Sequence, residues 1–201
     1  MRSGLALIVA FLLSLQAVSI AAAEPPLLIL MPGGSGVPKS DGFLIRNRAR
    51  LERAGFQIAV SSNSGQTLQA AKGARAKGRK VFLIGISLGV SRAAAALKAG
   101  APIDAVVFYS GAYSAAQQEL GSPRKLPPTL MVHHRQDKCP VTTPASAEAF
   151  KRWAGGRVTQ LVWISSSGDT HHWICGPKAA HGFFEKDIKP IAAAIRFLKG
   201  R

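Results

Sequence analysis

Short apolar runs alternate with longer amphipathic or alanine-rich stretches from residue 27 to the end of the chain. Leu27–Met31 is continuously apolar, which is typical of a strand that is buried on both faces of a sheet. Five further runs of similar length follow it. The pattern predicts strands at Leu27–Met31, Phe56–Val60, Lys80–Ile84, Ile103–Tyr109, Thr129–His133 and Val158–Ile164.

The stretches between these runs have the hydrophobic spacing of helices, and several of them end at a glycine. Gly55, Gly78 and Gly100 each follow such a stretch, and glycine readily takes the left-handed conformation that ends a helix. Pro190 falls inside the last stretch, which predicts a kink or a later helix start there. The predicted helices are Phe43–Ala54, Thr67–Lys77, Leu88–Ala99, Pro144–Trp153 and Phe184–Leu198.

The order of these elements indicates the fold class. Strands joined by helical crossovers are parallel neighbours, because an antiparallel pair needs only a short turn. No linker rich in proline, glycine or serine and no internal repeat interrupts residues 24–201. The sequence therefore predicts an α/β fold in a single domain, with one mostly parallel sheet of about six strands and helices on both faces.

Residues 1–23 have a different character. Arg2 precedes the apolar run Leu5–Leu15, and the small residues Ala21–Ala23 end the segment. These features are typical of a secretory signal peptide, whereas a permanent membrane span needs about 20 apolar residues. We expect cleavage after the last of these alanines, with an uncleaved anchor as the alternative. The mature protein would be periplasmic or secreted, without stable insertion in a membrane.

The 201 residues include 26 lysines and arginines against 10 acidic residues, a net charge of +16. This balance raises the question of nucleic acid or an anionic membrane as a partner. The basic side chains are not interleaved with aromatic residues as in single-strand binders, so we expect no nucleic-acid binding, although the charge allows adhesion to anionic surfaces. Many of them fall at helical spacings that predict solvated outer faces, namely Arg46, Arg50, Arg53, Lys72, Arg75, Arg79 and Lys80.

The segment Gly85–Gly89, with the sequence GISLG, lies directly between a predicted strand and a predicted helix. A G-x-S-x-G turn in this position forces the serine into a strained conformation, and its two glycines leave room for the adjoining strand and helix. The serine hydroxyl then projects above the sheet edge, beside the N–H of Leu88 at the helix start. Ser87 is therefore the candidate nucleophile, with an ordinary tight turn as the alternative.

With this elbow, the chain resembles the α/β-hydrolase family, in particular its small members without a large lid. The resemblance covers nearly all of residues 24–201, and it rests on the elbow, on the glycine-rich loop Pro32–Gly36, and on the order serine, aspartate, histidine along the chain. Pro32 stands where many esterases of the family have histidine. The family's oxyanion hole implies backbone N–H donors from Leu88 and from Gly34 or its neighbours Gly33 and Ser35.

The candidate acid is Asp137. It follows the predicted strand Thr129–His133, at the carboxyl edge of the sheet where the elbow also opens. The resemblance implies the same residue, because the family carries its acid after this strand. Asp104 begins a strand and so belongs to the opposite edge, while Asp169 stays open as an alternative.

A serine hydroxyl is a poor nucleophile until a base takes its proton. Of the five histidines, His181 lies after the last predicted strand and before the final helix, where the family keeps its base. Gly182 would allow a close turn that brings the imidazole over Ser87. His172 is the next candidate for the base, and it precedes His181 in the same loop together with His171.

Cys139 and Cys175 are the two cysteines of the chain. In an exported protein two thiols are expected to pair, because the compartment is oxidising. A bridge would join the loop of Asp137 to the loop of His181, and closing a loop of this length stabilises the fold by about 3 to 4 kcal/mol in the chain-entropy model. Two buried free thiols are the alternative.

Together these residues predict an exported serine hydrolase that cleaves carboxylic esters or related acyl bonds, without a cofactor. Esters lead because an uncapped site suits small or exposed acyl groups, while thioesters, amides and peptides use the same machinery. Tyr109, Tyr113 and His172 are candidate pocket residues. The short segment Gly111–Pro128 stands where larger relatives insert a lid.

Two more classes of function stay open. A non-catalytic binding protein on the same fold is one, although the complete serine, aspartate and histidine set argues against it. A zinc protein is the other, but no H-E-x-x-H or paired C-x-x-C motif fixes a geometry, and adjacent histidines on a strand face opposite ways. The residues suited to a metal, where we expect none, are His133, His134, Asp137, His171, His172 and Cys175.

Overall fold

The computed structural model describes residues 24–165 and 173–201. At its centre lies a six-stranded sheet with the strand order β2-β1-β3-β4-β5-β6. Every pair of neighbours is parallel, so the predicted α/β fold is confirmed and the described sheet is wholly parallel. The strands are β1 (Leu27–Met31), β2 (Gln57–Val60), β3 (Val81–Ile86), β4 (Ala105–Tyr109), β5 (Thr129–His134) and β6 (Val158–Ile164).

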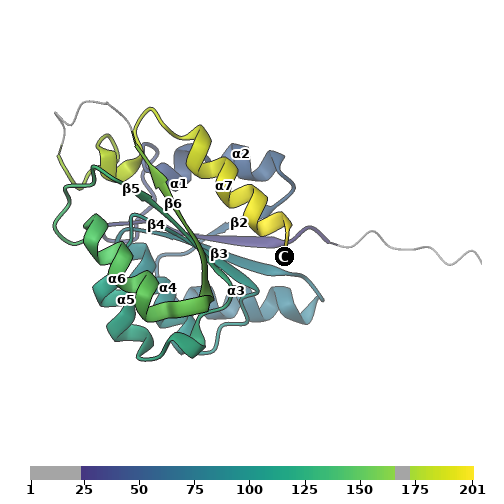
Figure 1. Ribbon diagram of the computed structural model, residues 1–201. Helices are drawn as coiled ribbons and strands as arrows, with labels where there is room; N and C mark the ends of the chain where they lie inside the picture. Colours follow the sequence, from purple (N-terminus) through teal and green to yellow (C-terminus); the bar gives the residue numbers. More distant parts are fainter. Residues whose placement is uncertain (1–23, 166–172) are drawn as a thin grey trace, which may run out of the picture.

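Helices cover both faces of the sheet, as Figure 1 shows. One face packs against α1 (Phe43–Arg46), α2 (Arg48–Arg53) and α7 (Ile188–Lys199). The other face packs against α3 (Ser64–Ala76), α4 (Leu88–Lys98), α5 (Tyr113–Leu120) and α6 (Pro144–Ala154). The sheet is thus the middle layer of three. Its four inner strands, β1, β3, β4 and β5, are buried at every position, whereas the edge strands β2 and β6 are partly exposed.

Strand β1 shows why its sequence is continuously apolar. Ile29 and Met31 belong to the core cluster under α3 to α6, whereas Leu28 and Leu30 belong to the cluster under α1, α2 and α7. Successive side chains of a strand point to opposite faces, so a strand covered on both faces needs apolar residues at every position. Burying this surface is the main favourable contribution to folding.

Three helices differ from the prediction. The single helix expected over 43–54 is wrong, because the chain leaves helical geometry at Asn47, whose side-chain amide donates to the carbonyl oxygen of Phe43 at 2.9 Å. The last helix starts at Ile188, four residues after Phe184, which is the later start that Pro190 predicted; Pro190 lies in the first turn, where its missing N–H costs nothing. Helix α5 lies in the segment Gly111–Pro128, for which the sequence predicted no helix.

The expectation that the basic residues form solvated faces is wrong for two arginines. The Arg79 side chain is only 7% exposed, and its Nε donates to the carbonyl oxygen of Pro25 at 2.8 Å. The Arg46 side chain is 18% exposed and contacts the C-terminal part of the chain. Arg46 and Arg79 therefore hold distant segments of the chain together. Their spacing in the sequence does not distinguish them from basic residues that face solvent.

The expected signal peptide, residues 1–23, lies outside the described residues. Within the part of the chain that the structure describes, no helix is both long enough and apolar enough to cross a membrane.

Candidate active site

Ser87 lies at the junction of β3 and α4 with a backbone φ of 56° and ψ of −126°. A positive φ is rare for a residue other than glycine, so this is a strained turn of the kind that the G-x-S-x-G motif predicts. At both flanking positions, Gly85 and Gly89, any side chain would come too close to a neighbouring backbone carbonyl. A Cβ on Gly85 would lie 2.9 Å from the carbonyl oxygen of Gly89, and a Cβ on Gly89 would overlap the carbonyl oxygen of Met31.

The glycine-rich loop after β1 packs directly on the elbow. A Cβ on Gly33 would lie 2.9 Å from the Cβ of Ser87, so only glycine allows this approach. Gly34 and Gly36 have φ values of 56° and 89°, and the N–H of Gly36 donates to the carbonyl oxygen of Gly33 at 3.1 Å. Leu88 is the first residue of α4, so its N–H has no acceptor within the helix. Backbone donors of the loop and of the helix start therefore adjoin the serine.

Asp137 follows β5, and its carboxylate is fully buried and hydrogen-bonded at both oxygens. Its Oδ1 accepts from the N–H of Cys139 at 2.9 Å, and its Oδ2 lies 3.0 Å from His181 Nδ1. The hydroxyl of Thr142 lies 3.0 Å from the same Oδ2 and 3.0 Å from the same Nδ1. With a proton on Nδ1, His181 donates to the carboxylate and leaves Nε2 free to accept a proton.

Thr142 is a site residue that sequence reasoning missed. It is completely buried, five positions after Asp137, in the loop between β5 and α6. No motif marks a threonine at this spacing, and only the fold brings its hydroxyl to the junction of the acid and the base. Its two contacts restrict both side chains at once.

His133 and His134 face opposite sides of β5. The ring of His133 packs against Tyr113 and Trp163, while the ring of His134 packs against Phe183. Burial lowers the pKa of His133 to about 4, although the charge of Asp137, whose Oδ2 lies 3.6 Å from His133 Nε2, acts in the opposite direction. His133 is therefore a neutral, buried neighbour of the acid at ordinary pH.

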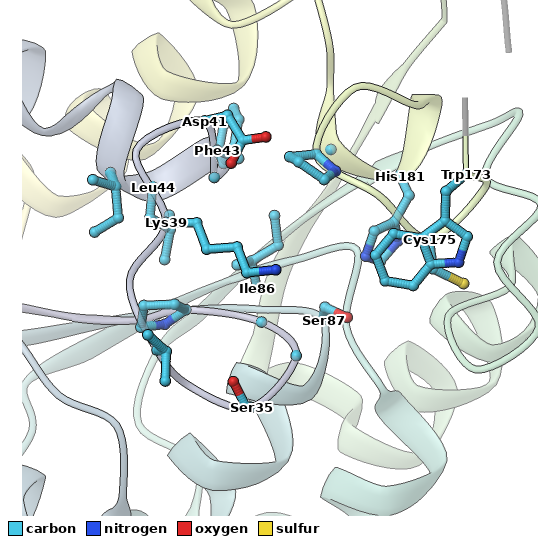
Figure 2. A pocket seen from close by; sticks show the side chains of 18 residues that line it. Ser35, Lys39, Asp41, Phe43, Leu44, Ile86, Ser87, Trp173, Cys175 and His181 are labelled. Carbon is cyan, nitrogen blue, oxygen red and sulfur yellow. The ribbon is translucent and has the colours of Figure 1, made fainter. Parts of the chain in front are cut away.

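A cavity of about 150 Å³ opens above the elbow. Figure 2 shows that Ser87 and His181 both line it, together with Lys39 from the segment before α1 and Trp173 beside the base. Trp173 is 71% exposed and Val37, also in the lining, is 60% exposed. The candidate nucleophile and the candidate base thus share one small cavity with exposed apolar side chains in its wall.

Cys139 and Cys175 form a disulfide, as predicted. The bridge spans 36 positions of sequence and joins the loop that carries Asp137 to the segment that precedes His181. Because its sulfur is bonded to Cys139, Cys175 is not a thiolate ligand for a metal. In the described residues there is no group of three or more histidine, cysteine, aspartate or glutamate side chains placed to hold a metal ion.

Two of the predicted pocket residues lie elsewhere. Tyr109 is completely buried, and its hydroxyl donates to the carbonyl oxygen of Pro190 at 2.9 Å. Tyr113 is completely buried between His133 and Phe150. Neither lines the cavity, so assigning them to the substrate pocket is wrong: Tyr109 ends β4, Tyr113 begins α5, and both side chains are in the core.

The alternatives for the acid and the base, and the aspartate that the sequence excluded, lie outside the described residues or away from this cavity. His171, His172 and Asp169 lie outside the described residues. Asp104 lies at the amino edge of the sheet, as expected, where its carboxylate accepts from the N–H of Val81 and pairs with Arg75, both at 2.7 Å.

The parallel sheet, the helices on both faces and the strained serine elbow together define an α/β-hydrolase fold. Solved structures of similar fold include a carboxylesterase from Lactobacillus plantarum, with a TM-score of 0.62 and 13% identity over 92% of this chain and 88% of that one. An α/β serine hydrolase homologue from Coxiella burnetii gives a TM-score of 0.64 and 15% identity over 87% and 85% of the two chains.

An acetyl ester-xyloside bifunctional hydrolase from Caldicellulosiruptor lactoaceticus gives a TM-score of 0.61 and 11% identity over 90% and 84% of the two chains. The sequence matches no protein-family model and no curated protein. Identities this low establish the likeness of the fold alone, so the activity has to be argued from the residues of the site.

Proposed function

We propose that this chain is an exported serine hydrolase that cleaves small carboxylic esters through an acyl-enzyme. The observation that carries the proposal is the cavity that Ser87 and His181 line together. Nδ1 of His181 is hydrogen-bonded to the buried carboxylate of Asp137. The known proteins of similar fold include one described as a carboxylesterase and one described as a serine hydrolase homologue, which agrees with this chemistry.

The mechanism is acyl transfer in two halves. Ser87 Oγ attacks the carbonyl carbon of the ester while His181 Nε2 takes the hydroxyl proton, and Asp137 stabilises the imidazolium through Nδ1. Backbone N–H groups of Leu88 and of the glycine-rich loop bind the negative oxygen of the tetrahedral intermediate. The intermediate expels the alcohol, which receives the proton from His181. Water then attacks the carbonyl carbon of the acyl-enzyme while His181 Nε2 takes its proton; the bond to Ser87 Oγ breaks, the proton passes to Oγ, and the carboxylic acid leaves.

The size of the cavity favours a short acyl group. A volume of about 150 Å³ holds a few heavy atoms, whereas sites for drug-sized ligands span about 300–1,000 Å³. The exposed side chains of Trp173 and Val37 offer apolar contact to an alcohol part that stays largely outside. We therefore expect acetyl or propionyl esters to react faster than long-chain esters.

Export is part of the proposal because the acid and base loops are joined by a disulfide. Such a bond persists in a periplasmic or extracellular setting, whereas cytosolic thiols are kept reduced. The pattern of residues 1–23 independently predicts a secretory signal peptide. Detection of the purified mature chain beginning at Glu24 would agree with both.

A fluorophosphonate probe tests the proposal, because it forms a stable bond only with an activated serine. The mature protein is incubated with the probe, the adduct is located by peptide mass spectrometry, and Ser87→Ala serves as the control. We expect a single adduct on Ser87, and turnover of 4-nitrophenyl acetate that falls by at least about 10³-fold in the alanine variant.

Two results would contradict the proposal. Folded, disulfide-bonded protein that gains no adduct and hydrolyses none of a series of acyl esters would leave a hydrolase fold without hydrolase activity. An adduct on another serine, with unchanged turnover in Ser87→Ala, would place the chemistry at a different site.

A further inference from the structure

Arg92 lies on α4, five positions after Ser87, and its side chain reaches back to the glycine-rich loop. Nη1 donates to the carbonyl oxygen of Gly34 at 2.9 Å, and Nη2 donates to the carbonyl oxygen of Pro32. One guanidinium therefore bridges two carbonyls of the loop that adjoins the nucleophile. A planar fork with two parallel donors fits such a pair of acceptors, and a lysine ammonium does not.

These contacts fix the direction in which the loop N–H groups point. In a trans peptide the carbonyl and the following N–H point in opposite directions, and no cis peptide occurs in the described chain. Because the Pro32 carbonyl points to Arg92, the N–H of Gly33 points away from it. The same holds for the Gly34 carbonyl and the N–H of Ser35.

The peptide between these two is held by the loop itself. The carbonyl oxygen of Gly33 accepts from the N–H of Gly36. The N–H of Gly34, in the same peptide as this carbonyl, therefore points away from Gly36. Three consecutive carbonyls, those of Pro32, Gly33 and Gly34, are thus engaged, two of them by the same side chain. Within the described residues, the N–H groups of Gly33, Gly34 and Ser35 have no protein acceptor, so it is proximity to Ser87 that distinguishes them.

Gly33 is the loop residue that approaches the nucleophile, since an added Cβ there would lie 2.9 Å from Ser87 Cβ and 3.5 Å from Ser87 Oγ. A Cβ on Gly34 would meet nothing within 4 Å. The donor nearest to the reacting centre is therefore expected from Gly33 rather than from Gly34, the residue to which the family pattern points first.

Glycine-rich backbone would not hold this arrangement unaided. Gly34 has a φ of 56°, and glycine moves between such conformations at little cost, so the loop needs an external restraint to present one set of donors. Catalysis by an oxyanion hole depends on donors that are already oriented before the charge develops. The positive charge of Arg92 lies beside the carbonyl oxygens of Pro32 and Gly34. It polarises these two peptide groups and so strengthens the N–H groups of Gly33 and Ser35 as donors.

Resting on the proposed hydrolase function, we propose that Arg92 is a positioning residue for the oxyanion hole. It holds the Pro32–Gly33 peptide so that the N–H of Gly33 acts together with the N–H of Leu88 on the oxyanion. Arg92 does not touch the substrate in this proposal. Its removal leaves Ser87, His181 and Asp137 unchanged and loosens one of the two donors.

The test compares Arg92→Ala, Arg92→Lys and Lys98→Ala with the mature wild-type protein. Lys98 is the matched control, because it is a basic residue on the same helix whose side chain is 52% exposed and pairs with Glu119. The measurements are kcat and KM for 4-nitrophenyl acetate, the rate of phosphonylation by the fluorophosphonate probe, and the thermal midpoint of each variant.

We expect Arg92→Ala to lower kcat by about 10- to 100-fold with little change in KM, because the donor acts on the transition state more than on the bound ester. Phosphonylation should slow in parallel, since its transition state carries charge on an oxygen in the same place. Arg92→Lys should fall between, and Lys98→Ala should match the wild type. Guanidinium ion at non-denaturing concentration should restore part of the lost rate in Arg92→Ala but not in Ser87→Ala.

The outcomes separate this proposal from the proposed function. Active, probe-reactive wild type together with an Arg92→Ala variant of equal kcat would overturn the positioning role alone. A loss of activity that follows only the loss of folded protein, without rescue by guanidinium, would overturn it as well, since Arg92 would then serve stability. Wild type without activity or labelling would overturn both proposals together.

Discussion

At the scale of single residues, the site is defined by how completely the buried acid is satisfied. Asp137 accepts from a backbone N–H, from the hydroxyl of Thr142 and from the imidazole of His181, and its side chain has no exposed surface. A buried carboxylate without such partners would be costly. The hydrogen bonds therefore hold the Asp137 carboxylate against the imidazole of His181, as the proposed mechanism requires.

Thr142 provides the sharpest test of this environment. Thr142→Val keeps the shape of the side chain but removes a hydroxyl that contacts both Asp137 and His181. Losing one hydrogen bond to a charged group costs about 1.5–3 kcal/mol, so we expect kcat for an acyl ester to fall by about 10-fold or more.

Thr142→Ser is the matched control, because it keeps the hydroxyl and should retain most of the activity. Steady-state kinetics on both variants, with thermal melting to monitor folding, separate the two roles of this side chain. Equal loss in the serine and valine variants would show that the methyl packing matters and the hydroxyl does not.

At the scale of elements, the segment that carries the proposed base, His181, contains only one short 3-10 helix, and side-chain contacts hold it in place. Arg46 of α1 donates to both carboxylate oxygens of Asp187 at 2.7 and 2.9 Å, and to the carbonyl oxygens of Gly182 at 2.6 Å and Pro177 at 3.1 Å. Its Nη1 also donates to the carbonyl oxygen of Asp41 at 2.7 Å. One arginine thus ties the residues on either side of His181 to a helix from the start of the chain.

The disulfide is the second restraint on this segment, and its removal should affect both stability and catalysis. For a loop of 36 positions the chain-entropy model gives about 3 to 4 kcal/mol. We expect a double Cys139→Ser and Cys175→Ser variant to melt about 10 °C lower than the wild type.

Turnover should fall as well, because Cys139 also supplies the N–H that Oδ1 of Asp137 accepts. Calorimetry and ester hydrolysis, measured below the lowered melting temperature, test the two effects separately. Treatment of the wild type with an alkylating agent alone is the control and should change nothing. A reduced or double-serine protein of unchanged activity would contradict the view that the bridge holds the acid and base in place.

At the scale of the whole molecule, stability depends on pH through groups that the fold buries. His133 has no exposed surface, and its pKa is lowered from 6.5 to about 4, mainly by burial. Below pH 6.5 the unfolded chain binds a proton on this imidazole while the folded chain does not. The free energy of unfolding therefore decreases as the pH falls from 6.5 to about 4, by at most about 1.4 kcal/mol per pH unit from this residue.

The variant His133→Phe tests this dependence, because phenylalanine keeps a ring between Tyr113 and Trp163 but does not titrate. Denaturant unfolding across the interval from pH 6.5 to about 4 should show a shallower loss of stability than in the wild type. Met131→Leu, a neutral change on the same strand and facing the same core, is the control. An unchanged slope in His133→Phe would mean that other groups carry the acid sensitivity.

The sequence predicted the elements whose pattern is local. Each described strand overlaps its predicted range. The signal was clearest for β1, β3 and β4, because burial on both faces requires a nearly unbroken apolar run. The elbow at Ser87 was recognisable because its two glycines and its place between strand and helix are dictated by contacts within a few residues. Helix α5 was missed since its mixed sequence, YSAAQQEL, forms a helix in contact with α4 and α6.

The site residues that sequence reasoning missed are those that act across long separations. Arg46 resembles any basic residue on a helix until Gly182, 136 positions away, accepts its hydrogen bond. Arg92 likewise reaches the loop at Pro32, 60 positions earlier. Tyr109 and Tyr113 were placed in the pocket because they lie at and just after the carboxyl end of β4, whereas the structure turns both side chains into the core.

The sequence alone therefore determined the fold class, the strained serine turn and the order of the candidate catalytic residues along the chain, because periodicity and turn chemistry act over short distances. Only the tertiary structure decided which side chains surround Asp137, which arginines hold the loops, and which glycine lies against Ser87. Such contacts depend on the packing of three layers around one sheet, and packing is a property of the whole chain rather than of any segment of it.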